Sequence, residues 1–130
     1  MKQKYIACWK NTLQHFQKLE FYRSFKNEHT ISDYLYLTRG TAERKALVKL
    51  RITNHKLMIE QGKYNQISRE NRHCPLCGSN QIENETHFLF HCFKYSIIRN
   101  NFYYKVQSLI PNITQLHVND LINELMKLLY

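Results

Sequence analysis

Four cysteine and histidine side chains in the middle of the sequence constrain this chain more than any other feature. Cys74 and Cys77 form a C-x2-C pair, His87 follows after nine intervening residues, and Cys92 follows after four more. Three thiolates and one imidazole are the donor set that a tetrahedral structural zinc ion takes from a protein. Gly78 comes directly after the pair and indicates a tight turn that aims both sulfur atoms at one centre. The sequence therefore predicts one Zn²⁺ held by Cys74, Cys77, His87 and Cys92.

Two other uses of paired cysteines fit this sequence less well. A redox C-x-x-C motif is expected beside a βαβ pattern, and no such pattern surrounds Cys74. A disulfide scaffold in a chain of 130 residues is expected to carry a signal peptide and more than the four cysteines that the whole chain contains. The fourth ligand has a rival, because on an ideal helix His87 and Cys92 lie about 140° apart, whereas His87 and His91 share a face. Thiolate suits a soft structural site better, so Cys92 is the predicted ligand and His91 the alternative.

Two stretches around these ligands resemble a known protein family. They are L-R-I-T-N-H-K-L-M-I-E-Q-G-K-Y from Leu50 to Tyr64, and R-x-C-P-L-C followed by I-E-x-E-x-H-F-L-F-x-C with the trailing Tyr95 and Arg99. Over these residues the chain resembles the C-terminal zinc-binding segment of reverse transcriptases from non-LTR (LINE-type) retrotransposons. A derivative or remnant that lacks the polymerase domain would carry the same residues.

The resemblance implies a segment that contacts nucleic acid and is not itself a catalytic centre. It also implies the same four metal ligands. The sequence departs from the family because it holds neither a polymerase aspartate pair nor an endonuclease segment. We therefore expect a module that is not an enzyme, either associated with a larger reverse transcriptase-containing protein or left as a remnant without function.

Basic residues are concentrated in the middle of the chain. The net charge is +9, and residues 39–73 hold nine basic side chains against three acidic ones. On an ordinary solvated helix face, ion pairs between neighbouring turns neutralise such charges. Here the acidic residues are too few for this pairing. Such a surface attracts the phosphate groups of nucleic acid. The predicted nucleic-acid-binding residues, for DNA or RNA, are Arg44, Lys45, Lys49, Arg51, Lys56, Arg69 and Arg72.

A second class of function fits the same features. The zinc turn could shape a docking face for an acidic protein partner, with the basic residues serving as a solvated surface. No catalytic residues are predicted, because no carboxylate cluster or spare histidine has catalytic spacing. Glu83 and Glu85 precede the ligand-bearing helix and are interpreted as acids that stabilise its N-terminus. His55 and His73 are interpreted as polar surface or packing groups.

The content of glycine and proline, three and two residues respectively, favours an ordered helical chain. No segment alternates apolar and polar residues for long enough to indicate a strand. We predict an all-α fold in a single domain over residues 1–130, in which a zinc module at about residues 69–95 packs its C-x2-C turn on a long helix. Apolar periodicity places the helices at residues 4–23, 41–55, 87–109 and 119–129, with a short one at residues 33–37.

The same pattern makes predictions for individual residues. Trp9 lies on the apolar stripe of the first helix and is expected in the core. Gly62 is expected to end the helical pattern before the zinc site. The apolar stripe from Phe88 to Leu109 is also predicted to be core. The predicted helix caps are Thr41, and Asn84 or Thr86.

The sequence carries no signal for a membrane or for export. No stretch approaches the roughly eighteen apolar residues that a membrane-spanning helix needs, and the N-terminal residues lack the apolar run of a signal peptide. We expect an intracellular protein, nuclear or cytoplasmic and not secreted. A reducing compartment also agrees with cysteines that are reserved for metal.

Overall fold

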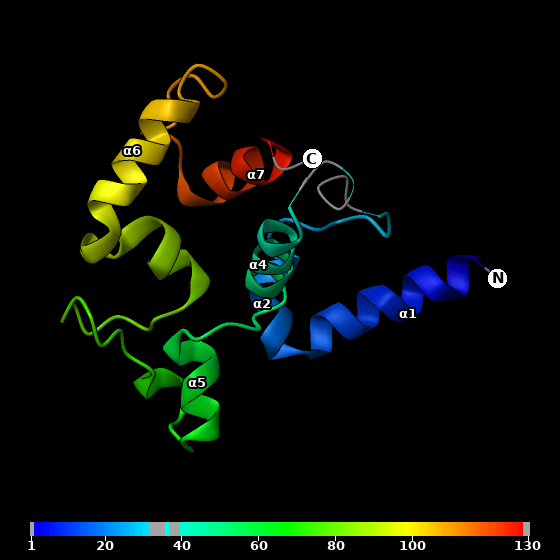
Figure 1. Cartoon of the computed structure of the whole chain (residues 1–130). Coiled ribbons are helices and arrows are strands. Elements are labelled where there is room, and N and C mark those ends of the chain that lie inside the picture. The colour runs from blue at the N-terminus through cyan, green and yellow to red at the C-terminus, as the bar shows by residue number, and fades with distance from the viewer. Residues whose placement is uncertain (1, 32–35, 37–39, 129–130) are drawn as a thin grey trace. The chain divides into compact units, whose positions relative to one another are not determined.

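The structure is a computed structural model that describes residues 2–31, 36 and 40–128, and these residues are mostly helical (Figure 1). Within them, β-structure is limited to a single isolated bridge. The prediction of a small all-α fold is therefore confirmed. The short helix predicted at residues 33–37 lies outside the described residues except for Tyr36. No helix among the residues that the structure describes is long and apolar enough to cross a bilayer.

The chain divides into two compact units. The first unit comprises residues 1–54 with 125–130, and the second comprises residues 55–124. The assignment of all 130 residues to one domain stays a prediction.

The first unit begins with two helices separated by a break. α1 (Lys2–His15) ends where Phe16 takes an extended conformation, with φ −94° and ψ 107°. The short η1 (Gln17–Leu19) and α2 (Glu20–Arg23) follow. The prediction of one continuous helix over residues 4–23 was therefore wrong at Phe16.

Arg23 accounts for this break. Its Nη1 donates 2.7 Å hydrogen bonds to the carbonyl oxygens of Leu13 and Gln14. These two carbonyls lie in the last turn of α1, where no backbone donor of the same helix reaches them. The guanidinium group supplies the donors that a longer helix would have supplied, so α1 can end without leaving these acceptors unsatisfied.

α4 (Thr41–Arg51) begins at the predicted residue and is shorter than the predicted helix at its C-terminal end. Thr41 is the first helical residue and not the cap, because the residue before it takes the extended cap conformation. At the other end Thr53 has φ 52°, and the Asn54 N–H turns back to the carbonyl of Lys49 at 2.8 Å. This is the hydrogen-bond pattern of a Schellman motif, and it stops the helix four residues before position 55.

A buried arginine packs against aromatic rings in the first unit. Arg51 is only 2% exposed, and its guanidinium carbon lies 4.8 Å from the ring centroid of Phe25 and 5.7 Å from that of Tyr22. Phe21 is buried and meets Phe25 edge-on. Trp9, which was predicted in the core, is half-buried.

The second unit contains a helix that the sequence pattern did not predict. α5 (Met58–Tyr64) includes Gly62, so the prediction that this glycine ends the helical pattern was wrong. α6 (Ser96–Val106) is the main helix of this unit. At the end of the described chain, α7 (Val118–Leu128) lies within one residue of the predicted helix at 119–129.

The long helix predicted at residues 87–109 is interrupted. η3 (His87–His91) is a turn of π-helix, Cys92 is extended with φ −61° and ψ 117°, and η4 (Phe93–Tyr95) leads into α6. The interruption separates Phe88 from the rest of the predicted stripe, and Phe88 packs edge-on against Tyr95 at 4.8 Å. The segment that follows the C-x2-C turn is thus a chain of short helical pieces.

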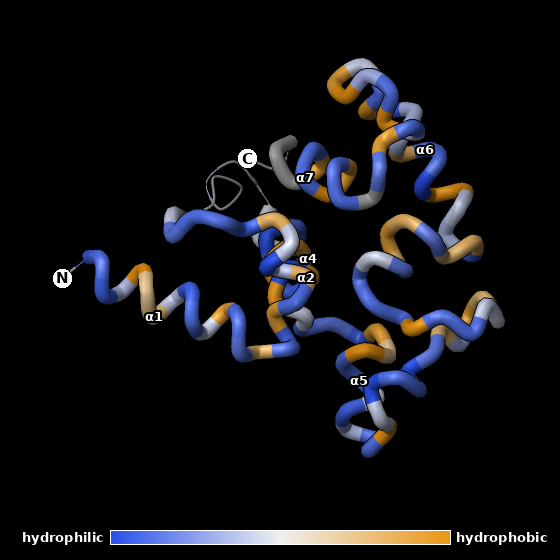
Figure 2. Tube along the Cα trace, turned by 180° about the vertical axis from the view of Figure 1, so that it is seen from behind, coloured by the Kyte–Doolittle hydropathy of each residue, from blue (hydrophilic) through white to orange (hydrophobic). Residues whose placement is uncertain are grey.

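The apolar stripe of α6 is not buried. Ile98 is 68% exposed and Leu109 beyond the helix is 65% exposed, so the prediction that they form core was wrong. Ile97 and Phe102 are exposed as well, and hydrophobic positions recur along α6 in Figure 2. Because the break at Cys92 disconnects α6 from the turn at His87–His91, the helical periodicity no longer indicates which face is covered.

Candidate metal centre

The four predicted ligands converge on one point. The ligand atoms of Cys74, Cys77, His87 and Cys92 all lie within 4.8 Å of one another, and all four residues are buried. The Sγ atoms of Cys74 and Cys92 are 4.0 Å apart, and Cys77 Sγ is 3.4 Å from His87 Nε2. Tetrahedral zinc with Zn–S bonds of about 2.3 Å would separate two sulfur atoms by about 3.8 Å. The donor set and its spacing therefore fit a metal ion of this kind.

A short hairpin positions the first two ligands. His73 pairs with Ile82 in the antiparallel bridge, and Cys74 N–H donates to the carbonyl of Gln81 at 2.8 Å. Between these two sides the chain turns through the C-x2-C pair. Gly78 has φ +62°, a left-handed conformation that glycine adopts without steric cost. The hairpin brings both sulfur atoms to the same side of the turn.

The π-helical turn decides between the two candidates for the fourth ligand. Cys92 N–H donates to the carbonyl of His87 at 2.7 Å, which is the bond between residues five apart that defines a π-turn. This wider turn brings Cys92 back over His87, although a regular helix would separate them. His91 is exposed and does not belong to the cluster. The geometry thus favours Cys92 over His91.

Two side chains hold the ends of this turn. Asn84 Oδ1 accepts a 2.8 Å hydrogen bond from His87 N–H, as the cap prediction for Asn84 required. At the other end, Arg99 donates from Nη1 to the carbonyl of Leu89 at 3.1 Å and from Nη2 to the carbonyl of Cys92 at 2.9 Å. Sequence reasoning gave Arg99 no structural role, because the carbonyls it contacts are free only where a helix is broken.

A glutamine orients the imidazole ligand. Gln81 Oε1 lies 2.9 Å from His87 Nδ1. A hydrogen bond from Nδ1–H to this oxygen leaves Nε2 unprotonated and facing the three sulfur atoms. Ligand histidines commonly donate their second ring N–H to such an oxygen. Gln81 was missed in the sequence because its position beside His87 depends on the hairpin, in which it pairs with Cys74.

In the absence of metal, the thiols of Cys74 and Cys77 differ widely in pKa. Burial raises the pKa of Cys74 to about 11. The hydroxyl of Ser79, 2.9 Å from Cys77 Sγ, lowers the pKa of Cys77 to about 6. Cys77 is therefore a thiolate at neutral pH, while Cys74 keeps its proton until a metal replaces it.

Glu83 and Glu85 are both buried. Glu83 was expected to stabilise the ligand-bearing helix, but its Oε2 instead accepts a 2.7 Å hydrogen bond from Met58 N–H at the start of α5. Its Oε1 lies 3.6 Å from Cys74 Sγ. Glu85 contacts His55 Nε2 at 3.0 Å, and the opposite ring nitrogen of His55 faces an N–H donor, so His55 serves packing in the interior.

The seven predicted phosphate-binding residues occupy different environments. Arg51 is buried against aromatic rings and cannot reach a phosphate group. Arg72 donates from Nε to the carbonyl of Ile67 at 2.9 Å and from Nη1 to that of Ile59 at 2.7 Å. The burial of Arg51 corrects its assignment to the nucleic-acid surface, whereas Arg72 is half-buried and its assignment stays a prediction. Arg44 and Arg69 are half-buried, and the exposed members of the set are Lys45, Lys49 and Lys56.

The chain has no significant match to a known family model, to a curated protein or to a solved structure. The resemblance to reverse transcriptases of non-LTR retrotransposons therefore stays a prediction. The buried cluster of three cysteines and one histidine is the feature on which a functional proposal can be built.

Proposed function

We propose that this chain is a zinc-stapled helical module that contacts nucleic acid and performs no catalysis. The observation that carries the first part is the buried cluster of Cys74, Cys77, His87 and Cys92. Zinc would cross-link the C-x2-C hairpin to the π-turn, which are two segments with few apolar contacts of their own. With all four positions filled by protein side chains, no position is left for a substrate or an activated water, as is usual for structural zinc. A reducing, intracellular compartment suits such a thiol-rich site.

The metal assignment is tested by zinc content and by the choice of the fourth ligand. Protein purified without chelator should contain one zinc ion per chain. Replacing Cys92 with alanine should abolish tight zinc binding, whereas His91→Ala should leave it unchanged. His91 is the matched control because it is adjacent in sequence and exposed. A metal content near zero in the parent, or loss of zinc in His91→Ala alone, contradicts the assignment.

The proposal of nucleic-acid contact rests on charge and on the family resemblance. The net charge is +9, and the exposed Lys45 and Lys49 project from α4, while Lys56 is exposed in the second unit. Each lysine that neutralises a phosphate releases condensed counterions, so affinity should fall as the salt concentration rises. In this proposal the chain corresponds to the C-terminal segment of a retrotransposon-type reverse transcriptase and acts beside a larger polymerase-containing protein.

Salt-dependent binding tests this part. The double variant Lys45→Gln/Lys49→Gln should bind every sequence more weakly than the parent and should flatten the plot of log affinity against log salt by about one to two units. Fluorescence anisotropy with labelled DNA and RNA at several salt concentrations measures both quantities. Equal affinity of parent and variant at low salt would exclude a phosphate-binding role for α4.

A second function is favoured by the exposed apolar residues of α6. Ile97 is 75% exposed and Ile98 is 68% exposed, and exposed apolar groups of this size on a helix often mark a protein contact. No acidic residue occurs between positions 86 and 119, and Lys94 precedes this helix while Lys105 lies in its last turn. An interaction module of this kind would bind an acidic segment with apolar side chains. Salt-resistant binding that is lost in Ile97→Ser/Ile98→Ser would favour this function.

A further inference from the structure

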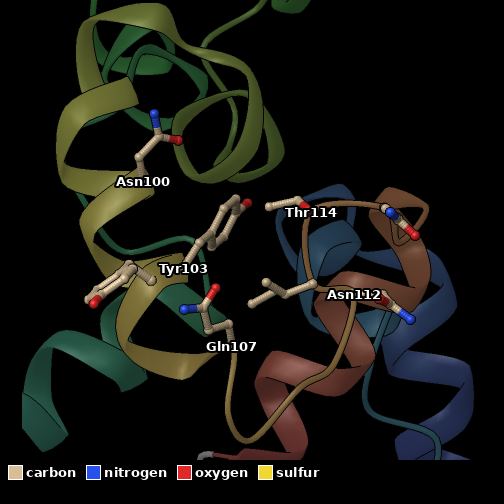
Figure 3. A pocket seen from close by; sticks show the side chains of 8 residues that line it. Asn100, Tyr103, Gln107, Asn112 and Thr114 are labelled. Atoms are coloured by element: carbon tan, nitrogen blue, oxygen red, sulfur yellow. The ribbon is translucent and has the colours of Figure 1, made fainter.

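A cavity of about 380 Å³ lies within the second unit, between α6 and the turn that precedes α7. Figure 3 shows that Asn100 and Tyr103 line it from α6 and Gln107 from the residue that follows this helix, with Tyr103 extending toward Thr114 on the opposite side. These three residues are separated by three and four positions, and because Gln107 continues the helical conformation at the end of α6, they share one face. The cavity is distinct from the cluster of metal ligands, none of which lines it.

The lining of this cavity is polar but carries no formal charge. Its polar groups are the amides of Asn100 and Gln107, the hydroxyls of Tyr103 and Thr114, and further amides from the turn. Burial raises the pKa of Tyr103, so its phenol is neutral over the physiological range. Ile113, only 3% exposed, adds an apolar surface.

This combination selects a class of ligand. A buried charged ligand would need a counter-charge, and the lining offers none. A purely apolar ligand would form no hydrogen bond with these amides and would displace water from the exposed ones, among them Asn100 and Gln107. A planar, neutral group with donors and acceptors on its edge and an apolar face satisfies both requirements. Side-chain amides bind base edges in this way, and tyrosine rings stack on base faces.

We propose that this cavity receives a single unpaired nucleobase. The inference rests on the proposed function in nucleic-acid binding, and it adds that the chain holds a single strand by one of its bases. A base inside a duplex cannot present its face and edge to such a cavity, so the proposal predicts a preference for single strands. Residues 86–119, which include the whole lining, contain no aspartate or glutamate, and Lys105 is exposed on α6, where a strand backbone could approach it.

Backbone hydrogen bonds hold both walls of the cavity in place in the absence of a ligand. On α6, Gln107 N–H donates to the carbonyl of Tyr103 at 2.9 Å. In the turn, Gln115 N–H donates to the carbonyl of Asn112 at 2.8 Å, and Asn112 takes the left-handed conformation with φ 62°. A preformed cavity spares a ligand the entropic cost of ordering the walls.

The direct test is a titration of the zinc-loaded, isotope-labelled full chain with free adenosine, guanosine, cytidine and uridine. At least one nucleoside should shift the backbone amide resonances of Tyr103, Gln107 and Thr114, and ribose alone should not. Shifts of the same size with ribose, or no shifts with any nucleoside, would overturn the proposal. Free nucleosides carry no phosphate, so this result does not depend on the lysines of α4.

The second test compares a single-stranded oligonucleotide with the same sequence as a duplex. The double variant Asn100→Ala/Gln107→Ala should bind the single strand about tenfold more weakly, as expected for loss of one stacked and hydrogen-bonded base, and should bind the duplex as the parent does. Asn101→Ala is the matched control, because Asn101 is exposed on α6 and does not line the cavity. Both Asn100 and Gln107 are exposed, so the fold should tolerate their replacement.

The two tests separate this inference from the proposed function. If Lys45→Gln/Lys49→Gln weakens binding and Asn100→Ala/Gln107→Ala does not, nucleic-acid binding stands and the base cavity is refuted. If nucleosides bind but no oligonucleotide does, the base cavity stands and the proposed function is refuted. Tyr103→Leu gives an independent check, because it removes the stacking ring while keeping an apolar side chain of similar reach.

Discussion

Arg99 on α6 reaches back to the backbone of the fourth candidate metal ligand, with its Nη2 2.9 Å from the carbonyl oxygen of Cys92. The same guanidinium donates from Nη1 to the carbonyl of Leu89 at 3.1 Å. Both acceptors lie where the π-turn ends and regular backbone donors are missing. Arg99 is thus a positioning residue, because it fixes the ligand's backbone without contacting the ligand atoms.

Replacing Arg99 with methionine should weaken zinc binding. The variant keeps the aliphatic bulk but leaves two carbonyl acceptors without their donor, so the extended conformation of Cys92 is no longer held. Groups that support metal ligands typically contribute 10- to 100-fold in affinity, and we expect a loss of about that size. Competition with a chromophoric chelator measures it. Lys105→Met is the control for charge and bulk on α6, and an equal loss in both variants would contradict the role of Arg99.

Gly62 leaves room for the side chain of Arg72 to cross α5. A methyl group at position 62 would lie 2.6 Å from Cγ and 2.8 Å from Cδ of Arg72. The arginine uses this passage to reach the carbonyls of Ile59 and Ile67. The glycine is therefore required by a close approach in the interior of a helix, where glycine otherwise costs stability.

Gly62→Ala should lower the free energy of unfolding by about 1 to 3 kcal/mol, although alanine is the better helix former by about 1 kcal/mol. The clash with Cγ and Cδ, near the root of the Arg72 side chain, outweighs the gain in helix propensity. Thermal or urea unfolding of the zinc-loaded protein measures the change. In a background of Arg72→Ala the same substitution should become stabilising, and a stabilising effect in the parent would refute the steric argument.

Zinc binding should release protons in a pattern set by Ser79. With the pKa of Cys74 at about 11 and that of Cys77 at about 6, binding at pH 7.5 removes a proton from Cys74 but almost none from Cys77. Because the metal-bound form is deprotonated, affinity should rise with pH across the range below 11, in which metal-free Cys74 is protonated. A pH indicator in weakly buffered solution measures the released protons.

Ser79→Ala removes the hydroxyl that lowers the pKa of Cys77, so this pKa should return toward the ordinary thiol value of about 8.5. More protons should then be released per zinc ion at pH 7.5, and the apparent affinity at neutral pH should fall. Ser79 is exposed, so the fold should be unaffected. Identical proton release in the parent and the variant would show that this hydroxyl does not control the thiolate.

The four candidate ligands were predictable from the sequence because metal sites use a few residue types, here cysteine and histidine, at regular spacings along the chain. The breaks in the predicted helices were not predictable, because each depends on a side chain from another segment of the chain. Arg23 satisfies the end of α1 across ten residues, and Arg99 satisfies the π-turn from the next helix. Periodicity assigns both arginines to a polar face, since it counts hydrophobic positions and does not register which backbone acceptors need a donor.

The same reasoning separates two basic residues that the sequence treats alike. Arg51 and Lys45 were both assigned to phosphate binding, yet Arg51 is 2% exposed and packs against the ring of Phe25, whereas Lys45 is exposed. Arg51→Gln should lower the free energy of unfolding by about 1 to 3 kcal/mol, because it removes a buried group from its partners. Lys45→Gln makes the same change in charge and should alter stability by no more than about 0.5 kcal/mol.

For nucleic-acid binding we expect the opposite: the lysine substitution should have the larger effect and the arginine substitution the smaller one. Lys45→Gln should weaken binding and reduce its dependence on salt, because a phosphate contact is lost. Arg51→Gln, compared at a temperature where both variants are fully folded, should bind as the parent does, since its charge does not face the solvent. Unfolding curves and anisotropy titrations on the same two proteins give both measurements. If Arg51→Gln weakens binding as much as Lys45→Gln while remaining folded, total charge governs the interaction and no defined lysine surface on α4 is needed.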